Sequence, residues 1–130
     1  MKKHLDFKKC QKKIFDRNTT CLEVVKSYLE RIKDKKDLNI FIEVFEEESI
    51  SRAKNIDKKI TNKSAGKLAG MIVAIKDNIC YKNHNVTAAS KILKNFKSTF
   101  SATVIERLIQ EDAIIIGRLN CDEFAMGSTN

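Results

Sequence analysis

The fold of this chain is decided by residues 66–78, which read GKLAGMIVAIKDN. Two glycines open this stretch, and five apolar residues, Met71 to Ile75, follow them. A short apolar run that is rich in β-branched side chains and follows turn residues is typical of a buried strand. Charge returns at Lys76, so we expect this lysine at the carboxyl end of the strand. In open α/β sheets, ligands bind at that end.

Lys76 is the candidate catalytic residue of this stretch. A lysine that leaves an apolar strand is partly withdrawn from water, and desolvation disfavours its charged ammonium form. A neutral amine can accept a proton from a hydroxyl group, whereas an ordinary lysine, with a pKa of about 10.4, cannot do so at neutral pH. The alternative is that Lys76 extends its charge to solvent and has no catalytic role. On chemistry alone the alternative is the more common case, because buried functional lysines are rare.

A second apolar strand is expected at residues 113–117, which contain three consecutive isoleucines. An irregular loop, residues 78–90, follows the first strand and includes His84. Between the loop and the second strand, the sequence predicts a helix that Ser101 caps, with an apolar side at Val104, Ile105, Leu108 and Ile109. The order strand, loop, helix, strand indicates a right-handed parallel crossover.

Two helices are predicted in residues 1–37, which would precede the α/β core. The first spans residues 5–17, where apolar side chains alternate with lysines at helical spacing. Thr20 and Glu23 form a capping box that opens the second helix, and a charged run, residues 31–37, ends it.

The α/β core is predicted to begin with a strand at residues 38–45. A helix should follow from Glu46 to about Ile60, because three consecutive glutamates suit the positive end of a helix dipole. The predicted fold class is therefore α/β.

The composition limits the kind of protein this chain can be. At 130 residues it makes at most one ordinary domain, and its 42% apolar content can supply a core. No run of about eighteen uncharged apolar residues occurs, which argues against a membrane span, and the N-terminus lacks the apolar run of a signal peptide. A cytoplasmic location is the plain interpretation.

The net charge is +8, and six of the first thirteen residues are lysines. Such a balance is compatible with an RNA partner, so a basic RNA-binding or assembly module is an alternative function. Few arginines and few aromatic residues accompany the lysines, and this favours ordinary solvated surfaces.

Cysteines and histidines give no metal or disulfide motif. The cysteines lie far apart in sequence, which favours free thiols in a reducing compartment, and they are Cys10, Cys21, Cys80 and Cys121. Neither His4 nor His84 has a neighbour at metal-ligand spacing. No carboxylate in the local sequence would orient His84, so a surface histidine is expected there.

The region around the two strands resembles a known family. Gly-x-Leu-x-Gly, an apolar strand and Ile-Lys-Asp-Asn, all within residues 66–78, resemble the lysine motif of the amidase signature family. Residues 112–128, which end in DEFAMGS, resemble one branch of it, the A subunits of glutamyl-tRNA(Gln) amidotransferases. Residues 89–93 and 102–108 also fit that branch. Lys67 and Ile72 stand where many relatives carry proline.

The resemblance implies a fold and a domain organisation. Residues 1–130 would form the N-terminal portion of one α/β/α sandwich with a mixed central sheet. Residues 1–37 would be a helical lead-in, and residues 38–130 would be the start of the core. The remainder of the domain would be absent from this chain. Without later strands, both apolar strands would have unpaired edges and the isolated piece would tend to aggregate.

The resemblance also implies a chemistry. Members of the family use a serine nucleophile, a second serine in a cis peptide and a lysine, and that lysine corresponds to Lys76. The first serine attacks an amide carbonyl, an acyl-enzyme forms and ammonia leaves. Both serines belong to a glycine-rich run that is expected downstream, so the 130 residues alone should have no glutaminase activity.

In the tRNA-dependent branch, the ammonia comes from glutamine and converts misacylated Glu-tRNA(Gln) to Gln-tRNA(Gln). The implied partners are a B subunit, which is the kinase and binds tRNA, and a small C subunit. ATP and Mg²⁺ are used by the kinase partner. No cofactor or metal is expected on this chain, and no membrane partner. A stand-alone amidase with a small-molecule amide substrate is the second enzyme alternative.

The last residues, 120–130, are predicted to form a loop and a short helix. We expect Asp122 to cap that helix rather than to act with Glu123, because adjacent helical residues face different directions. Gly127, Ser128 and Thr129 are small or hydroxylated and could lie against a substrate or a neighbouring loop. An ordinary turn is equally compatible with these residues.

Overall fold

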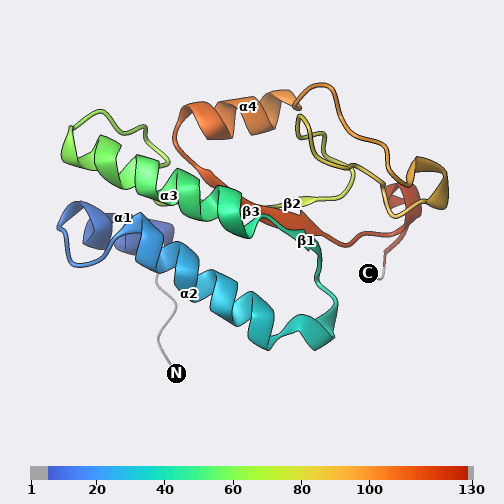
Figure 1. Ribbon diagram of the computed structural model, residues 1–130, viewed down its shortest axis with the longest axis horizontal. Helices are drawn as coiled ribbons and strands as arrows, with labels where there is room; N and C mark the ends of the chain where they lie inside the picture. The colour runs from blue at the N-terminus through green and yellow to red at the C-terminus, as the bar shows by residue number, and fades with distance from the viewer. Residues whose placement is uncertain (1–5, 129–130) are drawn as a thin grey trace.

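The computed structural model describes residues 6–128, which form a three-stranded mixed sheet with helices on both faces (Figure 1). The strands are β1 (Phe41–Val44), β2 (Ile72–Lys76) and β3 (Ile114–Leu119), in the order β1-β3-β2. β3 is parallel to β2 and antiparallel to β1. The predicted mixed sheet and the predicted parallel pair are confirmed.

The expectation of unpaired edges is wrong for the second apolar strand. β3 lies in the middle of the sheet, because β1 returns along its other side. Within residues 6–128, the outer edges of β1 and β2 have no partner strand. The crossover from β2 to β3 passes through α4 (Thr103–Gln110).

The two predicted N-terminal helices are present as α1 (Phe7–Phe15) and α2 (Cys21–Asp34). The capping box forms as expected: the Glu23 N–H donates to the Thr20 hydroxyl (3.1 Å), and the Thr20 N–H donates to the Glu23 carboxylate (3.2 Å). Leu5, the first residue of the predicted helix, lies outside the described residues.

The first strand is shorter than the predicted residues 38–45. A turn of 3₁₀ helix, Lys36–Leu38, comes first, and Asn39 then takes a left-handed backbone conformation with φ of 50°. Asparagine adopts this conformation more readily than most residues, so the chain turns here before it extends. α3 (Glu46–Thr61) begins at the predicted glutamates.

Two separate clusters of apolar side chains lie on opposite faces of the sheet. One joins α1, α2 and α3 to the sheet through Ile14, Val25, Ala53, Ile56 and Ile114. The other lies under α4 and contains Phe45, Ile75, Tyr81, Ile105 and Ile115. The side chains of Ile114 and Ile115, which are consecutive in β3, therefore lie on opposite faces of the sheet, as the pleat of a strand requires.

Gly70 allows the turn before β2 to pack against α1. Its φ is +85°, and an added Cβ would collide with the terminal carbon of the Ile14 side chain. A left-handed backbone and this close approach both favour glycine. The second glycine of the opening stretch thus fixes how the N-terminal helices meet the core.

One face of the sheet is left partly open. A groove of about 1010 Å³ runs between α2 and the sheet, lined in part by Ile72, Ala74 and Ile116. Its β1 rim is apolar yet exposed, with Ile40, Ile42 and Val44 each more than a third accessible. The contrast with the covered face shows that residues 6–128 do not bury the whole sheet.

None of the helices that residues 6–128 form has the length and apolar character of a membrane span.

Candidate functional site

Lys76 ends β2, where its backbone pairs with Leu119 of β3. Side chains alternate along a strand, so Lys76 stands on the same face as Ile72 and Ala74, the face of the open groove. Its side chain is exposed. The partial burial expected for Lys76 is therefore wrong for this chain, because no described residue covers the end of the outermost strand on that face.

Asp77, the next residue, is fully buried on the opposite face. Its carboxylate accepts hydrogen bonds from the Thr87 N–H (3.1 Å), the Thr87 hydroxyl and the Ala89 N–H (3.3 Å). It also pairs with the guanidinium of Arg118 at 2.7 Å. A buried carboxylate needs such partners, since an unpaired charge in the interior is strongly unfavourable.

Arg118 comes from β3 and links three segments of chain. Its Nη1 donates to Asp77 and to the Asn85 carbonyl oxygen, and its Nη2 donates to Glu43 of β1 at 2.8 Å. The side chain is only 3% exposed, and its Nε has no hydrogen-bond partner among the described residues. Arg118 therefore holds the loop after β2 against the carboxyl end of the sheet.

The loop of residues 78–90 has no helix or strand, as predicted, but it is held firmly at its far end. The Ala88 N–H donates to the Asp77 carbonyl oxygen at 2.9 Å, in addition to the carboxylate contacts of that residue. Asn85 forms an isolated antiparallel bridge with Lys97. The chain thus returns to the end of β2 about ten residues after it leaves that strand.

The last described segment packs on this loop. The Ser90 hydroxyl donates to the Glu123 carboxylate at 2.6 Å, and the Phe124 N–H donates to the Ala88 carbonyl oxygen at 2.8 Å. A 3₁₀ turn, Glu123–Ala125, forms the predicted short helix. Lys76, the loop and this turn are therefore gathered at the carboxyl end of β2 and β3.

Two predicted caps are wrong. Asp122 occupies the N-cap position of the 3₁₀ turn, but its side chain makes no capping hydrogen bond. The cap of α4 is Ala102, and the Ser101 hydroxyl instead accepts a hydrogen bond from the Lys82 N–H at 3.0 Å. At Ser101 this tertiary contact replaces the local capping pattern.

Of the three predicted substrate-binding residues, Gly127 and Ser128 are exposed and Thr129 lies outside the described residues. An added Cβ on Gly127 would collide with the Asp122 carboxyl group. The group that lies closest to Gly127 is therefore the Asp122 side chain, which belongs to the same loop.

His84 is not the unoriented surface histidine that the sequence predicts. Its Nε2 lies 2.9 Å from the Glu48 carboxylate, and its ring stacks on Tyr81 with centroids 4.0 Å apart. The Tyr81 hydroxyl donates to the same carboxylate, and burial followed by this bond raises the Tyr81 pKa well above its ordinary value. Glu48 could not be predicted as the partner of His84 from local sequence, because it lies 36 residues away, in the first turn of α3.

The cysteines are free thiols, as expected. Burial, and then the charge of Asp77, raises the pKa of Cys121, while the charge of Lys76 opposes this. Within residues 6–128, no three metal-ligating side chains gather at one place.

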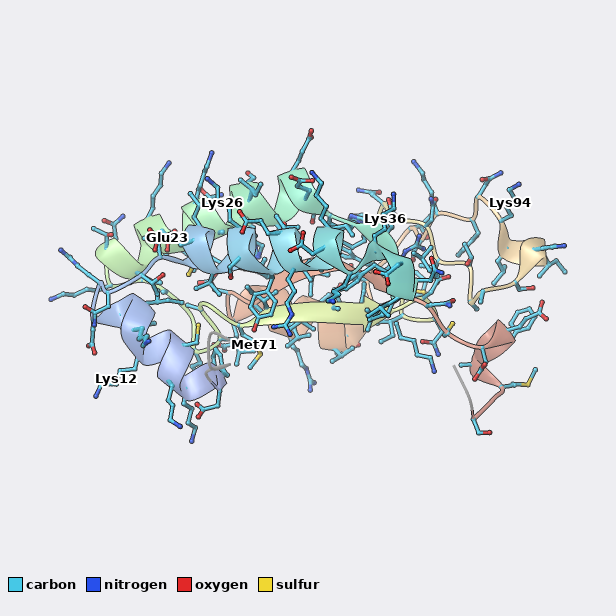
Figure 2. All side chains as sticks on the ribbon, turned by 90° about the horizontal axis from the view of Figure 1, so that it is seen from below. Lys12, Glu23, Lys26, Lys36, Met71 and Lys94 are labelled. Atoms are coloured by element: carbon cyan, nitrogen blue, oxygen red, sulfur yellow. The ribbon has the colours of Figure 1, made fainter. Side chains whose placement is uncertain are left out.

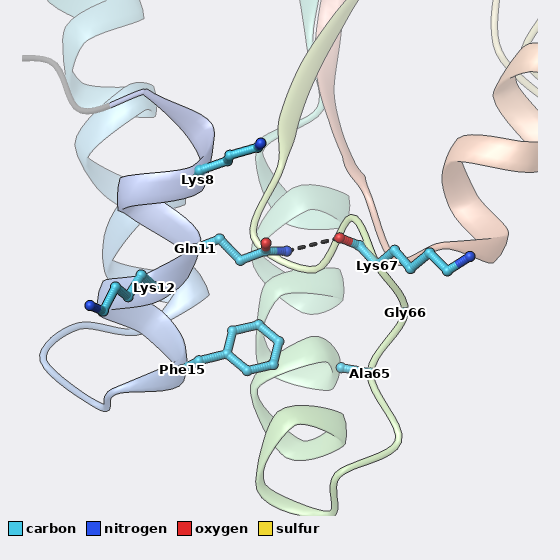
Figure 3. A pocket seen from close by; sticks show the side chains of 7 residues that line it. All are labelled: Lys8, Gln11, Lys12, Phe15, Ala65, Gly66 and Lys67. Atoms are coloured by element: carbon cyan, nitrogen blue, oxygen red, sulfur yellow. Dashed lines mark hydrogen bonds between the residues drawn. The ribbon is translucent and has the colours of Figure 1, made fainter.

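Lysines line two hollows of the described surface, and the groove between α2 and the sheet has four of them, Lys26, Lys33, Lys35 and Lys36, among its lining residues. A second hollow, about 450 Å³, lies between α1 and the turn before β2 and is lined partly by Lys8, Lys12 and Lys67 (Figure 3). In that view Lys12 and Lys67 point away from one another, and Gln11 donates to the Lys67 carbonyl oxygen at 2.9 Å. Figure 2 shows labelled lysines on elements across the molecule, from Lys12 on α1 to Lys94 near the other end.

Known proteins resemble the chain in sequence and in fold. An amidase family model matches residues 23–130. The A subunit of the glutamyl-tRNA(Gln) amidotransferase of Chlorobium phaeobacteroides is 55% identical over 113 residues, which are 86% of this chain and 24% of the relative. The chain thus spans about a quarter of the length of the curated relatives it matches.

Two solved structures share the fold. An amidase family protein from Bacillus anthracis superposes with a TM-score of 0.84 at 25% identity, over 92% of this chain and 25% of that chain. A protein from an inhibitor-bound complex, described as vestigial and as revealing the origins of an s-triazine catabolic enzyme, gives 0.89 at 26% identity, over 95% and 28%. The family model alone covers far more than half of the residues, so this chain belongs to the amidase family.

Proposed function

We propose that the chain forms the first quarter of the glutamine-hydrolysing component of a tRNA-dependent amidotransferase. The whole component would release ammonia from glutamine, and the ammonia would convert Glu-tRNA(Gln) to Gln-tRNA(Gln) in protein synthesis. The observation that carries the proposal is the 55% identity to the A subunit of a glutamyl-tRNA(Gln) amidotransferase. Amidases of known structure are less similar in sequence, at 19–25% identity.

Lys76 would act as the base that activates a serine nucleophile. The serine would attack the glutamine side-chain amide, the C–N bond would break, and ammonia would leave as the acyl-enzyme forms. This role needs an amine that is partly withdrawn from water, whereas the Lys76 side chain is exposed among the described residues. Residues beyond this chain would therefore have to cover the groove face beside Lys76.

The chain alone is proposed to be inactive, because no serine in it stands in the glycine-rich context that the family resemblance implies. Gly127, Ser128 and Thr129 would lie against the substrate in the whole protein. The proposal also includes the B and C subunits as partners, the use of ATP and Mg²⁺ by the kinase partner, and a cytoplasmic location.

A glutaminase assay of an enlarged protein tests the function. Residues 1–130 are joined to the remaining three quarters of the Chlorobium phaeobacteroides relative, and ammonia release from glutamine is measured with the partner proteins present. Lys76→Ala should lower kcat by at least about 10³-fold, the scale on which loss of a catalytic base and nucleophile pair acts. Lys12→Ala, at an exposed lysine of α1 at the other end of the molecule, is the matched control and should keep full activity (Figure 2).

Two outcomes would redirect the proposal. Hydrolysis of small amides in preference to glutamine would favour the stand-alone amidase. Salt-sensitive tRNA binding by the 130-residue chain, unchanged by Lys76→Ala, would favour a basic RNA-binding module. Retained glutamine hydrolysis in Lys76→Ala would end the assignment of this lysine.

A further inference from the structure

Asp77 connects the residue after Lys76 to a segment ten residues further along the chain. Its N–H donates to the Leu119 carbonyl oxygen at 3.1 Å, which extends the pairing of β2 and β3 one residue past Lys76. Its carbonyl oxygen accepts the Ala88 N–H at 2.9 Å. Both backbone groups of Asp77 are thus fixed, so the backbone that carries Lys76 is held on its C-terminal side.

The carboxylate adds a second set of contacts to the same segment. It accepts the N–H groups of Thr87 and Ala89, the Thr87 hydroxyl and a guanidinium N–H of Arg118. Ser90 follows this segment directly and donates to Glu123. One buried side chain therefore sets the path of residues 87–90 and, through Ser90, the place of the 3₁₀ turn that packs on them.

We propose that Asp77 is a positioning residue for the reaction of Lys76. This inference rests on the proposed function. The carboxylate holds residues 87–90 against the end of β2, so that this segment and Lys76 keep a fixed mutual arrangement on which the downstream serine and the substrate can be aligned. Asp77 itself does not touch the reacting atoms, because its carboxylate is fully buried on the face opposite to Lys76.

Asp112 is a matched control for a purely structural carboxylate. It is also almost fully buried, it accepts a backbone N–H from Gly66 (2.8 Å), and it pairs with a lysine, Lys59 (2.7 Å). It precedes β3, whereas Asp77 follows β2, so the two carboxylates lie at opposite ends of the parallel pair. Asp77→Asn and Asp112→Asn should both lower the stability of the protein. Only Asp77→Asn should also lower the kcat of the folded enzyme.

The first test measures kcat and KM for glutamine in the joined protein, corrected for the folded fraction. Asp77→Asn should lower kcat about 100-fold with KM within about threefold, because misplacement by about 1 Å costs this much. Thr87→Val should lower kcat about tenfold, whereas Thr87→Ser, which keeps the hydroxyl, should stay within about twofold of the unsubstituted protein. Asp112→Asn should leave kcat unchanged.

Equal kcat in Asp77→Asn and the unsubstituted protein, or equal losses in Thr87→Val and Thr87→Ser, would overturn the inference. If Asp77→Asn does not fold, the two Thr87 variants decide the matter. An unsubstituted joined protein without glutaminase activity would instead refute the proposed function.

A second test needs no activity. In the 130-residue chain, Asp77→Asn should speed amide hydrogen exchange at Thr87 and Ala89 by about tenfold or more, since these two N–H groups bond to the carboxylate that the substitution replaces. Exchange at Gly66, which Asp112 holds, should not change. Unchanged exchange at Thr87 and Ala89 would show that the Asp77 carboxylate does not anchor this segment.

Discussion

Asp77 and Asp112 are two aspartates of almost equal burial, at opposite ends of the same pair of parallel strands. Asp112 binds the Gly66 N–H before β2, and its cation is Lys59, whose side chain is 48% exposed. Asp77 binds loop residues after β2, and its cation is Arg118, which is 3% exposed.

The difference separates a stabilising end of the sheet from a functional one. At the Asp112 end the chain passes from α4 to β3 through only three residues, 111–113. At the Asp77 end it makes the long loop of residues 78–90 and the turn after β3, and the candidate catalytic lysine stands beside them. Binding sites of α/β proteins lie outside the carboxyl ends of strands, where such loops meet.

The largest expected effect comes from removing the buried cation. Arg118→Met leaves the Asp77 carboxylate without its ion partner in the interior and should cost about 4 kcal/mol of unfolding free energy. Urea unfolding of the 130-residue chain at neutral pH, followed by circular dichroism, measures this loss. Arg107→Met, at an exposed arginine on α4, should change stability by less than about 0.5 kcal/mol. Similar losses in both variants would contradict the burial argument.

A smaller loss is expected at the other end. Asp112→Asn keeps the shape of the side chain but removes the charge that Lys59 and Arg52 face, the latter at 3.7 Å. We expect a loss of about 2 kcal/mol, because Lys59 can turn to water once its partner is neutral. Asp34→Asn, at an exposed aspartate of α2, is the control for the urea measurement. A loss as large as that of Arg118→Met would remove the distinction between the two ends.

The outline of the fold could be predicted from the sequence because it depends on local patterns. Apolar runs located β2 and β3, a capping box located α2, and the glutamates at 46–48 located the start of α3. The shorter β1 was missed because the left-handed turn at Asn39 has no strong local signal.

The site could be predicted only in part. Lys76 was placed correctly at the end of β2, but its exposure depends on what covers the groove face, and no pattern in the sequence reports that. Asp77 and Arg118 were missed because their contact spans 41 residues. A signal existed: an arginine within an apolar strand must find a buried acceptor, and an aspartate that follows a strand is a natural one.

A pair of lysine substitutions sharpens the comparison. Lys59→Met removes the ion pair with Asp112 and should cost about 1 kcal/mol, whereas Lys76→Met removes an exposed side chain and should cost close to nothing. Both are measured by urea unfolding of the 130-residue chain. A loss at Lys76 equal to that at Lys59 would mean that Lys76 has a stabilising partner.

The smallest effect is the response of stability to acid. Burial raises the pKa of Asp112, but the Lys59 and Gly66 hydrogen bonds outweigh burial and hold this pKa below its ordinary value. A carboxyl group whose pKa is lower in the folded state stabilises the fold above its unfolded pKa of about 4, and this contribution is lost as the pH falls through the folded value. The urea midpoint should therefore decline below about pH 4, and it should decline less steeply in Asp112→Asn. Asp6, whose pKa is also lowered, is present in both proteins and cancels from the comparison. Equal acid slopes in the two proteins would show that the charge of Asp112 does not contribute to the stability of this end of the sheet.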